Sequence, residues 1–186
     1  MTTVTGPRHP RQSLVILQLL VVSFTAWLSA PPAKAADPCT PPVVSPIACE
    51  NSKPGTPQST WDISGAGDST IQGFTTDISV NVGQTVHFKI KTNARAYSIQ
   101  LYRLGYYGGN GARLVASIQP SASLPQTQPA CLGDTATGLT DCGNWAESAS
   151  WPVPSTAVSG IYLAMLRRSD TGGENQIPFV VRDDAS

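Results

Sequence analysis

Short runs of alternating apolar and polar residues dominate the sequence from about Ile71 onward, and turn-forming residues separate them every eight to twelve positions. In the run from Ser79 to Thr92, apolar residues occupy every second position on both sides of a Gly-Gln turn. Such alternation places apolar side chains on one face of a strand and polar side chains on the other. No window shows a helical stripe. Short strands at this spacing are typical of a β-sandwich or barrel.

The stretch from Ser159 to Ala164 indicates the kind of sandwich. A tyrosine two positions before a core residue is typical of the sixth strand of immunoglobulin-like sandwiches, and Tyr162 stands two positions before Ala164. Antibody domains have a cysteine at the position of Ala164, so we expect no disulfide between the sheets. We therefore predict an all-β, immunoglobulin-like antiparallel β-sandwich over residues 61–186. Its core should depend on large aromatic residues for bulk: Phe88, Trp145, Trp151 and Phe179.

The first 35 residues have the organisation of a secretory signal peptide. Two arginines precede an apolar run from Leu14 to Leu28, and Ala33-Lys34-Ala35 forms an A-x-A cleavage pattern. The apolar run is shorter than the ~20 residues that a membrane-spanning helix needs. We therefore predict a signal peptide over residues 1–35, export as a secreted or periplasmic protein, and no membrane attachment after cleavage.

A leader over residues 36–60 precedes the sandwich. It is rich in proline and serine and has no apolar period, so we expect an extended conformation. The mature chain holds four cysteines, Cys39, Cys49, Cys131 and Cys142, and an even number in an exported protein predicts disulfides. Three connectivities are open. We favour the local pairs Cys39–Cys49 and Cys131–Cys142, because turn formers flank each short loop, and the C-x-x-C spacings of metal sites are absent.

Composition limits the chemistry available to this chain. From Ala36 onward it has nine basic and twelve acidic residues, a net charge of −3, so no basic field exists to attract nucleic acid. Histidine occurs only at His9 and His87, which excludes most zinc sites and most histidine-dependent nucleophilic catalysts. His87 alternates with lysines, and we interpret it as a solvent-facing residue. We expect no catalytic residue and no cofactor.

The segment from Gly105 to Gly111 holds four glycines and two tyrosines in seven residues. It predicts a tight connection between the strands expected at 97–104 and 112–118, with glycines at positive φ angles. An aromatic cluster here could stack on a sugar, but we favour the alternative that it covers backbone and closes one end of the core. The candidate ligand-binding or structural residues of this turn are Tyr102, Arg103, Tyr106, Tyr107 and Arg113.

Two acidic pairs flank glycine-containing turns. Asp62 and Asp68 enclose a Ser-Gly-Ala-Gly loop that is a weak candidate for calcium, since its spacing matches no EF-hand and Asx turns account for it equally well. Asp170 and Glu174 flank a Gly-Gly turn, and we interpret them as solvated hairpin residues rather than paired catalytic carboxylates.

The segment Ile99 to Arg113, IQLYRLGYYGGNGAR, resembles a motif of the N,N-dimethylformamidase large-subunit family and of related large secreted bacterial proteins. The likeness extends to the patterns at 61–68 and 159–162 and covers roughly residues 50–186. The resemblance implies an N-terminal, non-catalytic module in front of a larger domain. In that family the mononuclear iron, with its tyrosine and glutamate ligands, belongs to the later domain, and no residue of this chain matches those ligands.

Together these observations predict a secreted accessory or binding module that forms the N-terminal part of a larger exoprotein. Its expected partners are a C-terminal catalytic domain or an extracellular polymer. The alternative is the leading domain of an iron-dependent amide hydrolase whose catalytic domain lies outside this chain.

Overall fold

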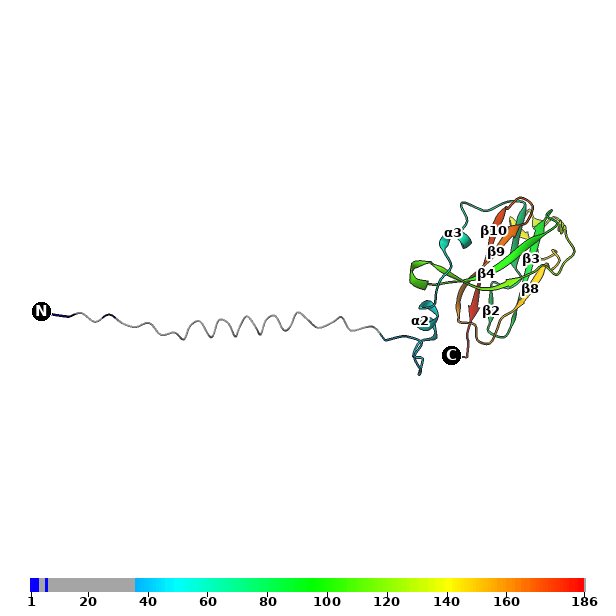
Figure 1. The fold of residues 1–186 in the computed structure, drawn as a ribbon. Helices are drawn as coiled ribbons and strands as arrows, with labels where there is room; N and C mark the ends of the chain where they lie inside the picture. Colours follow the sequence, from blue (N-terminus) through cyan, green and yellow to red (C-terminus); the bar gives the residue numbers. More distant parts are fainter. Residues whose placement is uncertain (4–5, 7–35, 186) are drawn as a thin grey trace. The chain divides into compact units, whose positions relative to one another are not determined.

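The fold is that of a computed structural model, which describes residues 1–3, 6 and 36–185. The predicted signal peptide lies almost entirely outside these residues. A compact unit begins at Asp37 and includes both the leader and the sandwich (Figure 1). Within the described part of the chain, no helix has the length and apolar character needed to cross a bilayer.

Two sheets form the sandwich. One has the strand order β1-β3-β8 and the other the order β2-β10-β9-β4-β5. The strands of the sandwich are β1 (Ile71–Thr75), β2 (Ser79–Asn81), β3 (Thr85–Thr92), β4 (Tyr97–Leu104), β5 (Ala112–Ile118), β8 (Ala149–Pro152), β9 (Gly160–Arg168) and β10 (Glu174–Arg182). The predicted all-β sandwich is confirmed, and β4 and β5 have the bounds expected from the alternation.

The core lies between the two sheets. Both sheets contribute buried residues, with Ile71, Phe88 and Trp151 from one and Leu101, Ala164 and Phe179 among those from the other. The rings of Trp151, Tyr162 and Phe179 are mutual neighbours, with centroids 5.6 to 6.1 Å apart. Aromatic rings bury large apolar areas. Packing of these rings therefore holds the two sheets together in place of the intersheet disulfide of antibody domains.

Tyr162 makes the corner contact that its position in the sequence indicated. Its hydroxyl donates to the carbonyl of Val158 at 2.7 Å, four residues upstream, and Ala164 is fully buried in the core. A tyrosine that bonds back to the preceding corner is typical of immunoglobulin-like sandwiches. The hydrogen bond fixes the loop between β8 and β9 against the start of β9.

The outer face of the five-stranded sheet has a second, smaller core. Met165 follows Ala164, and adjacent strand residues point to opposite faces, so Met165 lies outside the sandwich interior. It packs with Tyr102 and Ala112, and Trp61 and Ile63 pack against this group. Chain that precedes β1 therefore covers the outer face of the sheet.

The leader departs from the extended conformation we expected. It contains the helix α2 (Pro46–Asn51), and a second short helix, α3 (Gln58–Trp61), crosses its end. Ser45 caps α2 by accepting from the Ala48 amide, and Pro46 occupies the first turn, where its missing N–H costs nothing. Proline here begins a helix rather than preventing one.

Three further features differ from the expectation. The sandwich is not wholly antiparallel, because β2 crosses to the second sheet and pairs parallel with β10. The excursion closed by Cys131 and Cys142 forms a small hairpin of its own, β6 (Leu132–Asp134) with β7 (Leu139–Asp141). Trp145 stands outside the central core, against Phe74, with its indole N–H donating to Pro129.

Candidate functional site

The candidate residues of the glycine-tyrosine turn do not form one group in space. Tyr102 is buried in the outer-face core, and its hydroxyl donates to Gln100. Tyr106 is 70% exposed, whereas Tyr107, its neighbour, is 1% exposed. Arg103 and Arg113 join Tyr107 in a polar cluster against the leader. Two of the three tyrosines therefore have no free face to offer a ligand.

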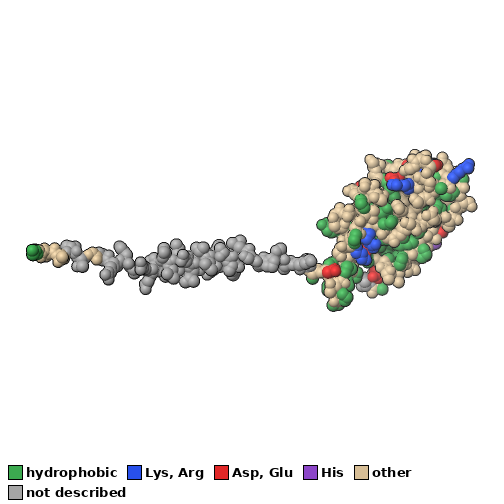
Figure 2. Space-filling model, in the orientation of Figure 1, with side chains coloured by type: hydrophobic (Ala, Val, Ile, Leu, Met, Phe, Trp, Pro, Cys, Tyr) green, Lys and Arg blue, Asp and Glu red, His purple; other side chains and the backbone are tan. Residues whose placement is uncertain are grey.

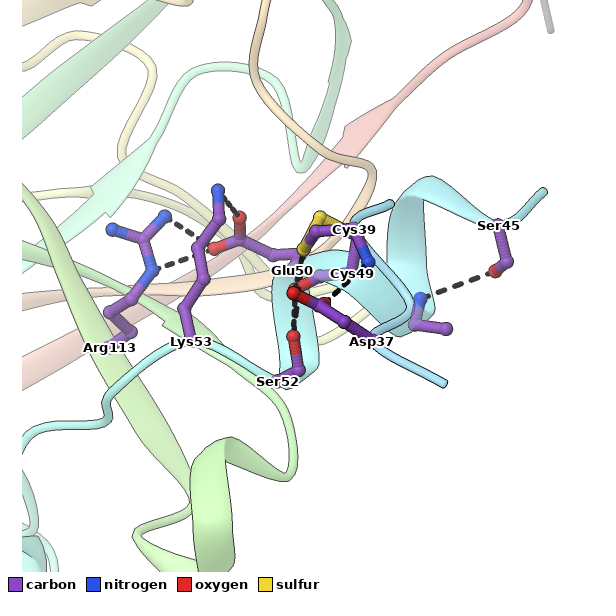
Figure 3. The surroundings of a disulfide bond; sticks show 9 residues. Asp37, Cys39, Ser45, Cys49, Glu50, Ser52, Lys53 and Arg113 are labelled. Atoms are coloured by element: carbon purple, nitrogen blue, oxygen red, sulfur yellow. Dashed lines mark hydrogen bonds and ion pairs between the residues drawn. A yellow bond between two sulfur atoms is a disulfide. The ribbon is translucent and has the colours of Figure 1, made fainter. Parts of the chain in front are cut away.

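The centre of this cluster is Glu50, which the sequence analysis did not single out. Glu50 lies in α2 and is 2% exposed. Its Oε1 accepts from Arg113 Nε at 2.7 Å, from Arg113 Nη2, and from the Tyr107 hydroxyl at 3.1 Å. Its Oε2 accepts from Lys53 Nζ at 2.6 Å. Figure 3 shows the heads of Arg113 and Lys53 directed at the same carboxylate.

Arg103 extends the cluster inward from β4. It is 3% exposed and donates to five acceptors, none of which is a carboxylate. Nη1 donates to Asn51 of the leader at 3.0 Å and to the Tyr107 hydroxyl at 2.9 Å. The other acceptors are carbonyls, of Leu104 and of Val158 and Ser159 in the loop before β9. We call Glu50, Asn51, Lys53, Arg103, Tyr107 and Arg113 the Glu50 cluster.

Charge and burial together set the protonation states of this cluster. Burial would raise the pKa of Glu50, but the hydrogen bonds and positive charges of Lys53 and Arg113 outweigh it, so its pKa lies below the ordinary 4.5. Burial also raises the pKa of Tyr107, which keeps the phenol protonated at neutral pH. Its hydroxyl therefore accepts from Arg103 and donates to Glu50, joining two groups that do not touch directly.

Further hydrogen bonds join the leader to β5 and the glycine-tyrosine turn beside the Glu50 cluster. Thr56 of the leader pairs with Ala112 of β5, and its hydroxyl accepts from the Leu114 amide. The indole N–H of Trp61 donates to the carbonyls of Thr56 and Asn110. The glycine-tyrosine turn contacts α2, and Figure 1 shows the two side by side. These bonds cover part of the edge of β5, which limits pairing with another chain there.

Both predicted local disulfides are present in the structure. Cys39 bonds to Cys49, and Cys131 bonds to Cys142. Cys49 immediately precedes Glu50, so the first disulfide fixes the helix that supplies the centre of the cluster (Figure 3). Disulfide pairs are consistent with an extracytoplasmic protein.

The weak calcium candidates make local hydrogen bonds. Asp62 accepts from Gln58, and Asp68 accepts from both the amide and the hydroxyl of Thr70. The Thr70 hydrogen bonds lower the pKa of Asp68. Among the described residues no group of three or more His, Cys, Asp or Glu side chains is placed to hold a metal ion. The side chains of residues 36–185 therefore offer no donor set that fits the iron that the family resemblance implies for a later domain.

The remaining candidates occupy other parts of the sandwich. His87 pairs through Nδ1 with Glu147 at 2.9 Å, and both side chains are 44% exposed. Asp170 and Glu174, expected to be solvated, are ion-paired with Arg168 and Arg167. The acidic residues at this hairpin therefore stabilise its ends instead of facing solvent alone.

The leader gives one sequence signal that would have found the missed residues. Glu50 and Lys53 are the only charged residues between positions 38 and 61. They stand three positions apart, the spacing at which helix side chains meet. An isolated charge pair directly after a disulfide cysteine indicates a fixed structural contact, but its partners, Tyr107 in the turn and Arg113 on β5, are more than 50 residues away.

Comparison with solved structures gives distant likenesses. One is to the structure of a cellulose-active LPMO, CelS2, in complex with copper, at 15% identity and a TM-score of 0.33. It covers 59% of this chain and 54% of that chain, so this chain spans about half the length of that protein. Another is to a Niemann-Pick type C2 protein from the Japanese carpenter ant, at 11% identity and a TM-score of 0.34, covering 66% of this chain and 98% of that one.

Comparison with curated protein sequences finds no match. A family model does match, and it is described as N,N-dimethylformamidase beta subunit-like, C-terminal. That description does not support the N-terminal placement implied by the resemblance. The match includes most of β4, the glycine-tyrosine turn and every later strand, but not the leader. Residues 98–186 are therefore a β-sandwich segment that matches the N,N-dimethylformamidase beta subunit-like, C-terminal domain family.

Proposed function

We propose that the mature chain is a non-catalytic accessory module of a secreted or periplasmic protein, in which the glycine-tyrosine turn anchors the leader to the sandwich. One observation carries this proposal. Arg103 and Tyr107, the polar groups that the turn could offer a ligand, are bonded to leader residues 50 and 51 and to each other. A turn whose polar side chains are used internally acts as a structural joint.

An anchored leader has a mechanical consequence. The Glu50 cluster and the Thr56 pairing fix the leader to the sandwich at two successive points, and the Cys39–Cys49 disulfide stabilises the leader internally. Preorganisation of this kind lowers the ordering cost when a partner binds. We infer that the leader and the adjoining turn form a rigid platform for another domain or subunit.

The direct test is an activity assay on the exported protein, purified with both disulfides intact. Incubation with N,N-dimethylformamide, with and without ferrous iron, should release neither dimethylamine nor formate. Turnover that rises with protein concentration and disappears on heat denaturation would overturn the non-catalytic assignment.

The family match supports a second candidate, a component of an amide hydrolase whose catalytic residues lie outside this chain. Deleting the gene in the organism that carries it separates the two proposals. If the chain is part of the hydrolase, extracellular or periplasmic amide hydrolysis should be lost and should return when the intact gene is restored. Unchanged hydrolysis in the deletion strain would leave the independent accessory module as the better assignment.

Binding of an extracellular polymer is the weaker partner proposal. Of the three tyrosines in and beside the turn, only Tyr106 has a largely exposed ring. A stacking platform needs several aromatic faces in one plane, and Tyr102 and Tyr107 do not provide them. A glycan array that detected binding by the wild type and not by Tyr106→Ala would favour this partner over a second protein domain.

A further inference from the structure

A cavity of about 280 Å³ lies where the leader meets the sandwich. Glu50 and Lys53 line it from the leader, Arg113 and Val115 from β5, and Trp151 and Tyr162 from β8 and β9. The loop between β8 and β9 supplies the rest of the lining. The volume is slightly below the ~300–1,000 Å³ of typical small-molecule sites, so an occupant would be small.

The polar side of this cavity is positively charged. Lys53 and Arg113 bring two positive charges to one negative charge on Glu50, which leaves an excess of one positive charge. This excess contrasts with the net charge of −3 on the chain from Ala36 onward. Charged side chains are sparse over the face of the domain that Figure 2 shows, so a local excess is little diluted by neighbours.

Both cations keep hydrogen-bonding capacity after they bind Glu50. The Lys53 ammonium has three N–H donors, and among the described residues one is used, on Glu50 Oε2. Arg113 directs Nε and Nη2 at Glu50, whereas Nη1 makes a single contact, 3.5 Å from the Leu114 carbonyl. An anion at the cavity mouth could therefore receive donors from both residues without displacing Glu50.

The same cavity also has apolar lining residues, and two of them are fixed in the core. Trp151 and Tyr162 pack with ring centroids 5.8 Å apart, and both are held in the core at 6% and 1% exposure. The Tyr162 hydroxyl is already bonded to Val158. Val115 and Ala157 complete this wall. A cavity that combines fixed apolar residues with a pair of cations favours a ligand that has both an apolar ring and a negative charge.

We propose that this cavity binds a small organic anion, a carboxylate carried on a single ring, with the carboxylate on Lys53 and Arg113 and the ring against Val115 and Trp151. The proposal does not depend on the accessory function, because residues of this chain line the cavity.

Benzoate and benzamide are the matched probes, since they share ring and size but differ in charge. Titrations of the exported, disulfide-intact protein, followed by tryptophan fluorescence and calorimetry, should show benzoate binding about tenfold more tightly than benzamide, or ~1.4 kcal/mol. Acetate, which has the charge without the ring, should bind more weakly than benzoate. Added salt should weaken benzoate binding and leave benzamide unchanged.

Lys53→Gln is the decisive variant. Lys53 is 45% exposed, and glutamine retains a donor for Glu50, so the fold should survive. We expect benzoate affinity to fall about fivefold or more and benzamide affinity to stay the same. Lys89→Gln is the control, because Lys89 bonds to the Gly143 carbonyl away from the cavity lining.

Three results would overturn the proposal: no saturable benzoate signal, equal affinity for benzoate and benzamide, or an unchanged benzoate affinity in a folded Lys53→Gln variant. Equal affinity for acetate and benzoate would overturn the part that assigns the ring to the apolar wall. Melting curves of each variant establish that the fold is intact before binding is compared.

Discussion

Arg103 and Arg168 lie at opposite ends of the antiparallel pair formed by β4 and β9, and both are nearly buried. Arg103 stands opposite Tyr162, whereas Arg168 stands opposite Tyr97. Arg168 forms a two-point ion pair with Asp170, two residues away, and donates through Nη1 to Asn93 and Thr70. Arg103 has no such carboxylate among its five acceptors and reaches one, Glu50, only through the Tyr107 hydroxyl.

The difference shows how one fold accommodates two buried guanidinium groups. At the Arg168 end the counter-charge is local, exposed and supplied by a hairpin residue. At the Arg103 end the counter-charge is distant in sequence, buried and supplied by the leader. A buried charge is costly unless its partners are in place, so the Arg103 end is stable only while the leader is docked.

The largest effect should come from Arg103→Met, which keeps apolar bulk and removes five donor bonds. Asn51, the Tyr107 hydroxyl and two loop carbonyls would lose their donor, and we expect the free energy of unfolding to fall by about 3–5 kcal/mol. Urea denaturation measures the loss. Arg95→Met, at an exposed position before β4, is the matched control and should change little. A loss below 1 kcal/mol for Arg103→Met would show that the cluster is dispensable.

Glu50→Gln tests the same end through the counter-charge. The amide still accepts hydrogen bonds, but it leaves the charges of Arg113 and Lys53 uncompensated, and we expect a loss of about 2–3 kcal/mol at neutral pH. In a double-mutant cycle with Arg113→Met, the double variant should lose less stability than the sum of the two single-variant losses. Simple additivity in that cycle would contradict a direct ion pair.

The pH dependence of Glu50 has a definite sign. Its pKa is lower in the folded protein than its ordinary 4.5, so the ionised carboxylate contributes stability above that pH. This contribution is lost as pH falls through the folded pKa. The difference in unfolding free energy between wild type and Glu50→Gln should therefore be largest near neutral pH and shrink below pH 4.5. A difference that stays constant down to pH 3 would contradict the assignment.

The two ends also differ in what the sequence could predict. Alternation located β4 and β5, and the Ser159-Gly160-Ile161-Tyr162-x-Ala164 pattern predicted the strand corner at Tyr162, because these patterns depend on residues close together in the sequence. The Arg168–Asp170 pair is equally local. The hydrogen bonds that join the leader residues of the Glu50 cluster to its sandwich residues span 52 to 63 positions, and no periodicity relates the two groups.

The prediction that the leader is extended was wrong because it treated every proline as a helix breaker. Proline breaks a helix interior but suits a first turn, and the Ser45-Pro46 pair is a helix start. The sequence also could not show which tyrosine of the turn is buried, because Tyr106 and Tyr107 are the same residue type at adjacent positions. Tyr107 is buried where its hydroxyl bonds to Arg103 and Glu50, and its φ is 43°.

One glycine near the Arg103 end and one near the Arg168 end allow the effect of backbone strain to be tested separately from the effect of side-chain charge. Gly108 and Gly172 have φ angles of 65° and 70°, and a Cβ at either would meet open space. Alanine at either site should cost about 1 kcal/mol, because an L-residue is disfavoured at these angles. Melting curves and urea titrations should show a similar loss of stability for the two variants. A much larger loss at Gly108 would show that the turn, and not the charges alone, couples the leader to the sandwich.

The smallest effect should come from Asp170→Asn, which breaks the ion pair at the Arg168 end. Asp170 is half exposed, so water replaces much of what it provides, and Arg168 keeps its bonds to Asn93 and Thr70. We expect a lower melting temperature than wild type, with a smaller shift than for Glu50→Gln. High salt should reduce the difference further.

The pH window of Asp170 distinguishes it from Glu50. The hydrogen bond and charge of Arg168, aided by backbone amides, hold the pKa of Asp170 at about 2, below its ordinary 3.8. Its contribution is therefore complete above pH 3.8 and declines as pH falls toward 2. Melting temperatures of wild type and Asp170→Asn should differ by a constant amount from neutral pH to pH 4 and converge only below it. Convergence that begins well above pH 4 would show that the Arg168 pair depends on a second titrating group, and that the two ends are less independent than their contacts indicate.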